Sequence, residues 1–285
     1  MSYLEAQSMD LLAPVFTTTT KKIALIYSRS VHDARRRLLV FPAARRGSQC
    51  IDHLSWVCEP PPHAHRERTD EFGNRVLELY HTRIVRELNF AMTLVTHRST
   101  QAVPSSVGVP EVGLGAFLLP SALADGANAI RDLMRESLAE AGAQNTIEIA
   151  TALCGRAHAS LCYRPGSSHV GTTASQALAR GEGVCQDYAH LMTALCRAAG
   201  LPARYVSGYN PAEGLMHAWV EVLCDSQWLA WDPTHNRRTG NNCVFVACGR
   251  DFRDVTPVRG TYVGGANAKL TVHCRTRVTQ DAAGH

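Results

Sequence analysis

The sequence Gly183-Val184-Cys185-Gln186-Asp187-Tyr188-Ala189-His190 joins a short glycine-containing turn to the strongest helical pattern in the chain. Apolar side chains recur at three- and four-residue steps after Cys185, and Gly200 ends the pattern. We therefore predict a helix that begins at Cys185. The unpaired N–H groups and the positive dipole end of such a helix favour a thiolate over a thiol. Cys185 is thus a candidate nucleophile, and a small buried residue at a helix start is the alternative interpretation.

A nucleophilic cysteine needs a base, and the nearby His190 is badly placed for that role. Five residues along a helix turn the side chain by about 500°, which leaves His190 well away from the face of Cys185. His217 begins a strand-like run, and Asp232 ends the next one before Pro233. In an antiparallel hairpin the start of one strand lies opposite the end of the next, so we expect His217 and Asp232 at the same edge. Each alone has a structural alternative, but together with Cys185 they predict a catalytic triad.

The first part of the chain has the pattern of an antiparallel β domain. We interpret residues 1–20 as a flexible lead-in and residues 21–112 as the β domain, whose last part, 99–112, is a linker rich in proline, glycine and serine. Short, evenly spaced strands separated by turn residues are typical of this class. The expected strands are 23–27, 37–41, 51–57, 75–80 and 87–96, with a turn at 70–74.

The second part of the chain has helical patterns first and strand patterns afterwards, which favours an α+β fold over alternating βαβ units. We place this domain at residues 113–255 and a C-terminal strand and tail at 256–285. The expected helices begin at the candidate caps Ser121, Asn145 and Thr172 or Thr173, and the last one spans 185–199. The expected strands are 204–209, 217–223, 228–231 and 244–247.

The composition excludes several classes of protein. A chain of 285 residues with 45% hydrophobic and 19% charged residues is not disordered and is long enough for a core. The net charge of +4 is too mild to indicate nucleic-acid binding, and no apolar run reaches the length of a membrane span. We interpret the arginine runs 35–37 and 45–46 as a solvated strand and turn. Ten cysteines without a secretory leader predict reduced thiols and a cytoplasmic protein.

A metal site is the main chemical alternative to a thiol nucleophile. The segment 50–65 contains the ligand-type residues Cys50, Cys58, His63 and His65. Their spacing lacks the paired cysteines of structural zinc sites, and the chain has no H-E-x-x-H motif. We therefore expect no metal and no other cofactor.

Three motifs together resemble the transglutaminase-like superfamily: the run 183–190, His217-Ala218-Trp219-Val220-Glu221, and Trp231-Asp232-Pro233-Thr234. The chain resembles in particular the bacterial transglutaminase-like proteins, which are often labelled cysteine proteases. The turn 70–74 and the segment 249–260 resemble further parts of that family, so the resemblance covers about residues 20–280. It implies a papain-like core in which Cys185 is the nucleophile, His217 the base and acid, and Asp232 the residue that orients the histidine.

The implied reaction is acyl transfer from a peptide or another amide through a thioester on Cys185. Water would resolve the thioester in a peptidase or amidase, and an amine would resolve it in a transglutaminase. Tyr209 and Gln186 are candidate substrate contacts, although a packed strand-end tyrosine is an equally good interpretation of Tyr209. The alternative function is a catalytically silent binding or scaffold module.

Overall fold

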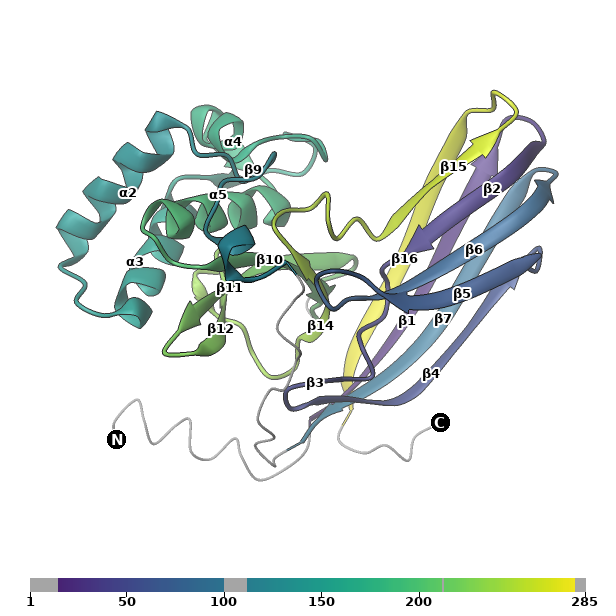
Figure 1. Cartoon of the computed structure of the whole chain (residues 1–285), viewed down its shortest axis with the longest axis horizontal. Coiled ribbons are helices and arrows are strands. Elements are labelled where there is room, and N and C mark those ends of the chain that lie inside the picture. The colour runs from purple at the N-terminus through teal and green to yellow at the C-terminus, as the bar shows by residue number, and fades with distance from the viewer. Residues whose placement is uncertain (1–14, 100–111, 212, 280–285) are drawn as a thin grey trace.

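The computed structural model describes residues 15–99, 112–211 and 213–279. Two units lie side by side, a β-sandwich and an α+β domain whose helices gather at the end away from the sandwich (Figure 1). This arrangement confirms the predicted α+β fold class with an antiparallel β domain. No helix within the described ranges is both long enough and apolar enough to cross a membrane.

The sandwich consists of two antiparallel sheets with strand orders β16-β1-β7-β4-β3 and β15-β2-β6-β5. Alternate side chains on its strands are buried, as expected for sheets that face each other across a core. Its first seven strands are β1 (Val15–Tyr27), β2 (Val31–Leu38), β3 (Arg45–Arg46), β4 (Gln49–Glu59), β5 (Ala64–Thr69), β6 (Arg75–Ile84) and β7 (Glu87–Arg98).

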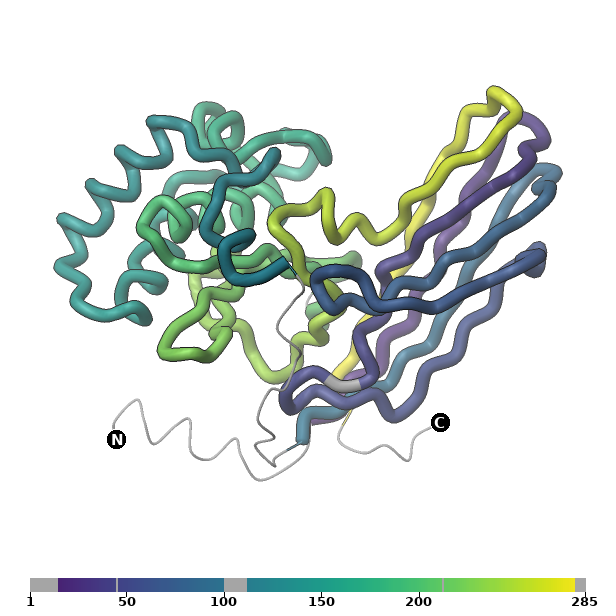
Figure 2. The backbone as a smooth tube through the Cα atoms, in the orientation of Figure 1, coloured from purple at the N-terminus to yellow at the C-terminus, as the bar shows by residue number. Residues whose placement is uncertain are grey.

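Both ends of the described chain build this sandwich. After the α+β domain the chain returns to it (Figure 2) and adds one strand to each sheet, β15 (Val258–Val263) beside β2 and β16 (Ala268–Thr279) beside β1. The β16–β1 pairing continues from Ala268 opposite Tyr27 to Thr279 opposite Phe16. The segment 256–285 was expected to form a separate strand and tail. Its two strands instead belong to the sheets of the sandwich, and they pair with strands that lie more than 200 residues earlier in the sequence.

The predicted lead-in is also corrected, because β1 already begins at Val15. Thr17 and Thr19 are buried, and the Thr19 hydroxyl hydrogen-bonds that of Thr276 at 3.2 Å. β-branched threonine fits a strand well, so the polar run extends the strand where its partners satisfy the hydroxyl groups. Residues 1–14 of the lead-in and 100–111 of the predicted linker lie outside the described residues.

In the α+β domain, helices pack on an antiparallel sheet with the strand order β13-β12-β11-β10-β14. Helix α5 (Cys185–Ala198) packs on β10 and β11, so the predicted cysteine helix lies on the middle of the sheet. The remaining elements are η2 (Leu114–Phe117), α2 (Asn128–Ala141), α3 (Thr146–Ala159), β8 (Cys162–Tyr163), α4 (Ala174–Arg180), β9 (Glu182–Gly183), β10 (Ala203–Tyr209), β11 (Met216–Cys224), β12 (Gln227–Asp232), β13 (Arg237–Arg238) and β14 (Val244–Gly249).

Two of the predicted helix caps are present. The Asn145 side chain accepts the backbone N–H of Glu148, and Thr173 forms a reciprocal capping box with Gln176. Ser121 does not cap a helix, because α2 begins seven residues later, at Asn128. Its hydroxyl instead accepts the N–H of Ala124 within a separate turn.

Side-chain amides of the sandwich cover the outer edge of β14. Gln49 accepts the N–H of Phe245 at 2.8 Å and donates to its carbonyl oxygen at 2.9 Å, and Asn74 makes the same pair of bonds with Cys248 at 2.8 Å each. The two amides reproduce the pattern of a neighbouring strand, so this edge is not open for pairing with another chain. They also fix the α+β sheet against the sandwich.

A buried ion pair strengthens the same contact. Glu221 on β11 accepts from Arg204 at 2.6 Å and from Arg46 of the sandwich at 3.1 Å. Burial alone would raise the pKa of Glu221, but the two guanidinium groups outweigh it and lower the pKa. The carboxylate thus stays ionised between two cations, one from each unit.

Candidate functional site

The start of α5 is held by Asp187. Its Oδ2 atom accepts the backbone N–H of Val184 at 2.8 Å and the hydroxyl of Ser168 at 2.5 Å. A Cβ atom at Gly183 would lie only 2.6 Å from the Cβ atom of Asp187, so glycine is required for this close approach. Burial raises the pKa of Asp187, although these hydrogen bonds act in the opposite direction. The residue therefore positions the helix start and the loop that contains Ser168.

Cys185 is the first residue of α5 and its side chain is partly exposed. As the first residues of a helix, Cys185 and Gln186 have backbone N–H groups without an intrahelical acceptor. These groups can stabilise negative charge beside the thiol. The Gln186 side chain donates to the carbonyl oxygen of Val170 at 3.4 Å, next to the same helix start. A substrate contact by Gln186 stays a prediction.

The structure brings His217 and Asp232 together at one end of the β11–β12 hairpin. Nε2 of His217 donates to Oδ2 of Asp232 over 2.9 Å, and both residues are 2% exposed. Because α5 packs on β11, the helix start bearing Cys185 meets this end of the hairpin. The placement expected from antiparallel geometry is therefore observed.

The charges of this group are set by competing effects. Burial alone would lower the pKa of His217, but the hydrogen bond with Asp232 and the nearby Cys185 thiol outweigh it and raise the pKa to about 10. Burial would raise the pKa of Asp232, but its hydrogen bonds with His217 and His235 lower it. Nδ1 of His217 is buried and makes no hydrogen bond of normal geometry to any described residue. At neutral pH the site thus holds a carboxylate beside an imidazolium, whose Nδ1 remains for the thiol.

His190 lies in the core, as its helical angle from Cys185 requires. The side chain is fully buried, and Nε2 accepts the backbone N–H of Phe252 at 3.2 Å. Burial lowers the pKa of His190 to about 4, so the ring is neutral at pH 7. His190 therefore takes no part in the Cys185 site.

Tyr209 lies buried at the contact between the two units. Its side chain is fully buried, the hydroxyl donates to the carbonyl oxygen of Val40, and the ammonium of Lys21 lies 5.3 Å from the ring centroid. With no exposed surface and with its hydroxyl hydrogen-bonded, Tyr209 offers nothing for a substrate to contact. Of the two interpretations of Tyr209, the structure therefore favours a tyrosine packed at the end of its strand over a substrate contact.

Three residues near the site were not singled out from the sequence. His235 donates from Nδ1 to Oδ2 of Asp232 at 2.8 Å, and Oε1 of Glu213 lies 3.7 Å from Nε2 of His235. Tyr163 is 49% exposed, and its pKa is raised by burial and then by the charges of Cys185 and Glu213. Only His235 had a sequence signal, since it follows Asp232 by three residues.

The ligand-type residues considered for zinc between Cys50 and His65 do not gather into a site. Cys58 Sγ lies 3.8 Å from Nε2 of His81, and His65 packs edge-on against Trp56. Among the described residues, the group whose ligand atoms lie within 4.8 Å of one another is Glu213, His217 and His235.

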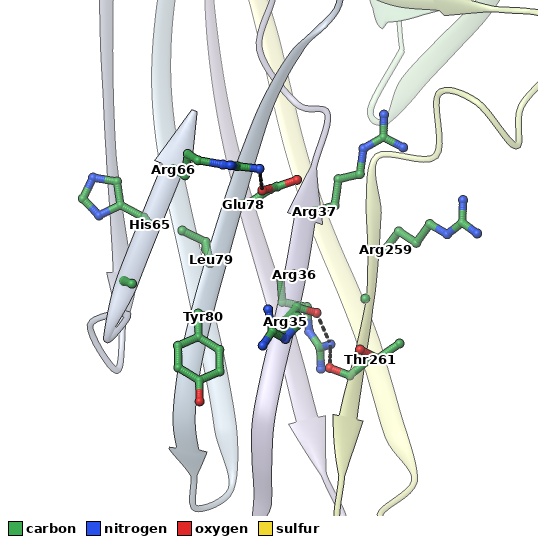
Figure 3. A pocket seen from close by; sticks show the side chains of 12 residues that line it. Arg35, Arg36, Arg37, His65, Arg66, Glu78, Leu79, Tyr80, Arg259 and Thr261 are labelled. Atoms are coloured by element: carbon green, nitrogen blue, oxygen red, sulfur yellow. Dashed lines mark hydrogen bonds and ion pairs between the residues drawn. The ribbon is translucent and has the colours of Figure 1, made fainter. Parts of the chain in front are cut away.

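A hollow of about 630 Å³ lies on the β15-β2-β6-β5 sheet (Figure 3). Arginines from three strands line it, and Arg37 and Arg259 occupy paired positions on neighbouring strands. Its carboxylate, Glu78, pairs with Arg66 at 3.0 Å. Arg36 departs from the predicted solvated face, because it is buried and donates to the carbonyl oxygen of Thr261. No residue of the Cys185 site lines this hollow.

Two family models match the chain. The transglutaminase-like superfamily model matches residues 135–233, which include Cys185, His217 and Asp232. The model of the bacterial transglutaminase-like N-terminal region matches residues 20–96, which form most of the sandwich. The matched segments together span both units of the fold.

Several known proteins are similar to this chain. An uncharacterized protein of Mycobacterium tuberculosis is 29% identical over 279 residues, which cover 86% of this chain and 87% of that protein. An uncharacterized protein of Mycobacterium leprae is 36% identical over 126 residues, so the match spans 41% of this chain and 45% of that protein. The crystal structure of a candidate cysteine protease from Cytophaga hutchinsonii has the same fold, with a TM-score of 0.73, 24% identity, and coverage of 92% of this chain and 91% of that one. This chain belongs to the transglutaminase-like superfamily.

Proposed function

We propose that this protein is a cysteine-dependent acyl-transfer enzyme that acts on amide bonds through a thioester on Cys185. The observation that carries the proposal is the continuous line of groups from Asp232 through His217 to the thiol at the start of α5. The carboxylate fixes the orientation of the imidazole, and the imidazolium stabilises a thiolate beside it.

In the first half-reaction the Cys185 thiolate attacks the carbonyl carbon of an amide. The oxyanion that forms is stabilised by backbone N–H groups at the start of α5. His217 then gives the Nδ1 proton to the leaving amine, the C–N bond breaks, and an acyl thioester remains on Cys185. His217 becomes neutral in this step, while Asp232 stays ionised.

In the second half-reaction a water molecule or a primary amine attacks the thioester. His217 takes a proton from this nucleophile, and the C–S bond breaks to restore the thiolate and the imidazolium. Water gives a carboxylic acid, and an amine gives a new amide. The same three residues serve both outcomes, so the triad geometry is compatible with each.

The names of two similar proteins correspond to the two outcomes, amine transfer and hydrolysis. A protein-glutamine gamma-glutamyltransferase of Pseudomonas aeruginosa is 44% identical over 66 residues, which cover 19% of this chain and 10% of that protein. The structural neighbour from Cytophaga hutchinsonii is described as a candidate cysteine protease. We therefore propose a peptide or protein amide as the substrate class.

The decisive experiment offers the protein a library of peptides that contain glutamine and internal amide bonds, with and without a primary amine. Mass spectrometry detects cleavage, deamidation or amine incorporation, together with the acyl adduct on Cys185. We expect turnover by the wild-type protein and by Cys50→Ala, which removes a partly exposed thiol on the sandwich, and none by Cys185→Ala. Absence of turnover and of adduct in the wild-type protein would favour the silent scaffold alternative.

A further inference from the structure

Asp232 orients two histidines and not only His217. Its Oδ2 atom accepts Nε2–H of His217 at 2.9 Å and Nδ1–H of His235 at 2.8 Å. An ionised carboxylate can only accept hydrogen bonds, so both of these ring nitrogens carry protons. In the neutral form of each ring, the lone pair is therefore on the other nitrogen, Nδ1 of His217 and Nε2 of His235.

These two nitrogens face the same carboxylate. Oε1 of Glu213 lies 3.8 Å from Nδ1 of His217 and 3.7 Å from Nε2 of His235, and the three atoms lie within 4.8 Å of one another. Nδ1 of His217 is buried, lies near the Cys185 thiol and makes no hydrogen bond of normal geometry to any described residue. Once His217 gives up its Nδ1 proton, two imidazole lone pairs and a carboxylate oxygen therefore point towards one another.

The geometry is close to that of a tetrahedral zinc site. Zinc–ligand bonds of about 2.0–2.1 Å place neighbouring ligands about 3.3–3.4 Å apart. The two distances from Oε1 of Glu213 exceed this by about half an ångström or less, and the three ligand atoms all lie within 4.8 Å of one another. Glu213 lies in the connection between β10 and β11 with 30% of its side chain exposed. Zinc binding therefore requires these side chains to approach one another by at most about 1.5 Å. Histidine ligands whose second nitrogen donates to a carboxylate are the usual arrangement around zinc, and Asp232 supplies that carboxylate for both rings.

The three residues differ in their exposure to solvent. His217 is 1% exposed at its side chain, whereas His235 is 35% exposed. Glu213 and His235 are therefore the solvent-accessible members of the group, and His217 is its buried member. Glu213 and Asp232 together offset the charge of a divalent ion.

We propose that Glu213, His217 and His235 form an inhibitory binding site for Zn²⁺, with water as the fourth ligand. Zinc at Nδ1 of His217 takes the place of the proton that faces Cys185, so the metal and the thiolate–imidazolium pair exclude each other. The binding part of this proposal is independent of the proposed acyl transfer, and only the inhibition rests on it.

Zinc binding is measured by competition with a chromophoric chelator, using the whole chain with Cys185→Ala so that the reactive thiol cannot contribute. We expect one zinc ion to bind in the micromolar range or tighter. Glu213→Gln and His235→Ala in this background each weaken binding by at least about tenfold. The matched control is His97→Ala, which removes a histidine that pairs with Asp52 at 2.8 Å on the sandwich and leaves zinc binding unchanged.

The second measurement needs no substrate. Zinc should slow alkylation of Cys185 by iodoacetamide in the wild-type protein, a chelator should restore the rate, and Glu213→Gln should need at least about tenfold more zinc for the same effect. Zinc affinity that is the same with and without Glu213→Gln and His235→Ala overturns the site. Failure of acyl transfer alone would leave the binding result intact, so the two proposals are tested separately.

Discussion

The carboxylate of Asp232 accepts the Nε2–H of His217 at 2.9 Å between the ends of two neighbouring antiparallel strands. Both residues are buried, so water competes little for this hydrogen bond. The bond leaves one ring nitrogen of His217 for the thiol at the start of α5. It therefore links the hairpin geometry directly to the protonation state of the site.

We expect Asp232→Asn to lower the pKa of His217 from about 10 towards or below its ordinary value of 6.5, because burial then acts against a weaker hydrogen bond. Acyl transfer should fall by about 10²–10⁴-fold. In the wild-type protein the raised pKa stabilises the fold fully below pH 6.5, and this contribution is lost as the pH rises through about 10. NMR titration of the histidine and the alkaline limb of the activity profile measure the change.

The control for that variant is Asp52→Asn, which disrupts the exposed pair with His97 on the sandwich. It should leave both the His217 titration and the activity unchanged. An unaltered His217 titration in Asp232→Asn would contradict the proposed role of the carboxylate.

We expect Cys185 to react with iodoacetamide at pH 7 about tenfold or more faster than any other cysteine. All ten cysteines are free, but burial raises the pKa of Cys58 to about 11 and that of Cys154 to about 12. The exposed Cys162 is the internal reference because it lacks a position at a helix start. Timed labelling with peptide mapping measures each site, and equal rates at Cys162 and Cys185 would refute the activation of Cys185.

Lys21 is a buried cation at the contact between the two units. It is 2% exposed, and burial lowers its pKa from 10.5 to about 8, although Cys274 acts in the opposite direction. The unfolded chain binds more protons between pH 8 and 10.5, so this residue makes the fold more stable as the pH rises through that range. We expect Lys21→Met to raise the free energy of unfolding at pH 7 by about 1–3 kcal/mol, less near pH 10.

Urea unfolding at the two pH values measures this difference. The neighbouring Lys22 is exposed, so Lys22→Met is the matched control and should change the free energy of unfolding by less than about 0.5 kcal/mol at either pH. A free energy of unfolding of Lys21→Met below that of the wild type at pH 7 would contradict the prediction, because other groups would then stabilise the Lys21 charge in the folded protein.

Asn74→Ala should lower the free energy of unfolding by about 1–3 kcal/mol, because the buried N–H and carbonyl groups of Cys248 lose their partner. The outer edge of β14 also becomes free to pair with other chains, so we expect concentration-dependent association. Urea unfolding and light scattering measure the two effects. The control variant Gln227→Ala, at an exposed position, should change neither the stability nor the association. An Asn74→Ala protein as stable as the wild type would show that the hydrogen bonds of this amide to β14 do not stabilise the fold.

The sequence predicted the parts of the site that depend on local rules. The helix start at Cys185 follows from apolar spacing and from Gly183, whose missing side chain leaves room for Asp187. The meeting of His217 and Asp232 follows from two strands joined by a short turn. The two confirmed caps, Asn145 and Thr173, are likewise contacts over three residues.

Tertiary structure alone decided the contacts between distant segments. The pairing of β16 with β1, the burial of Tyr209 against Val40 and the approach of Glu213 to His217 and His235 all depend on how separate elements pack. No local pattern encodes such partners, because a strand edge or a side chain is satisfied by whichever group the completed fold places beside it. The sequence by itself therefore determined which thiol lies near a histidine and an aspartate at the ends of two neighbouring strands, and the folded chain determined what else surrounds them.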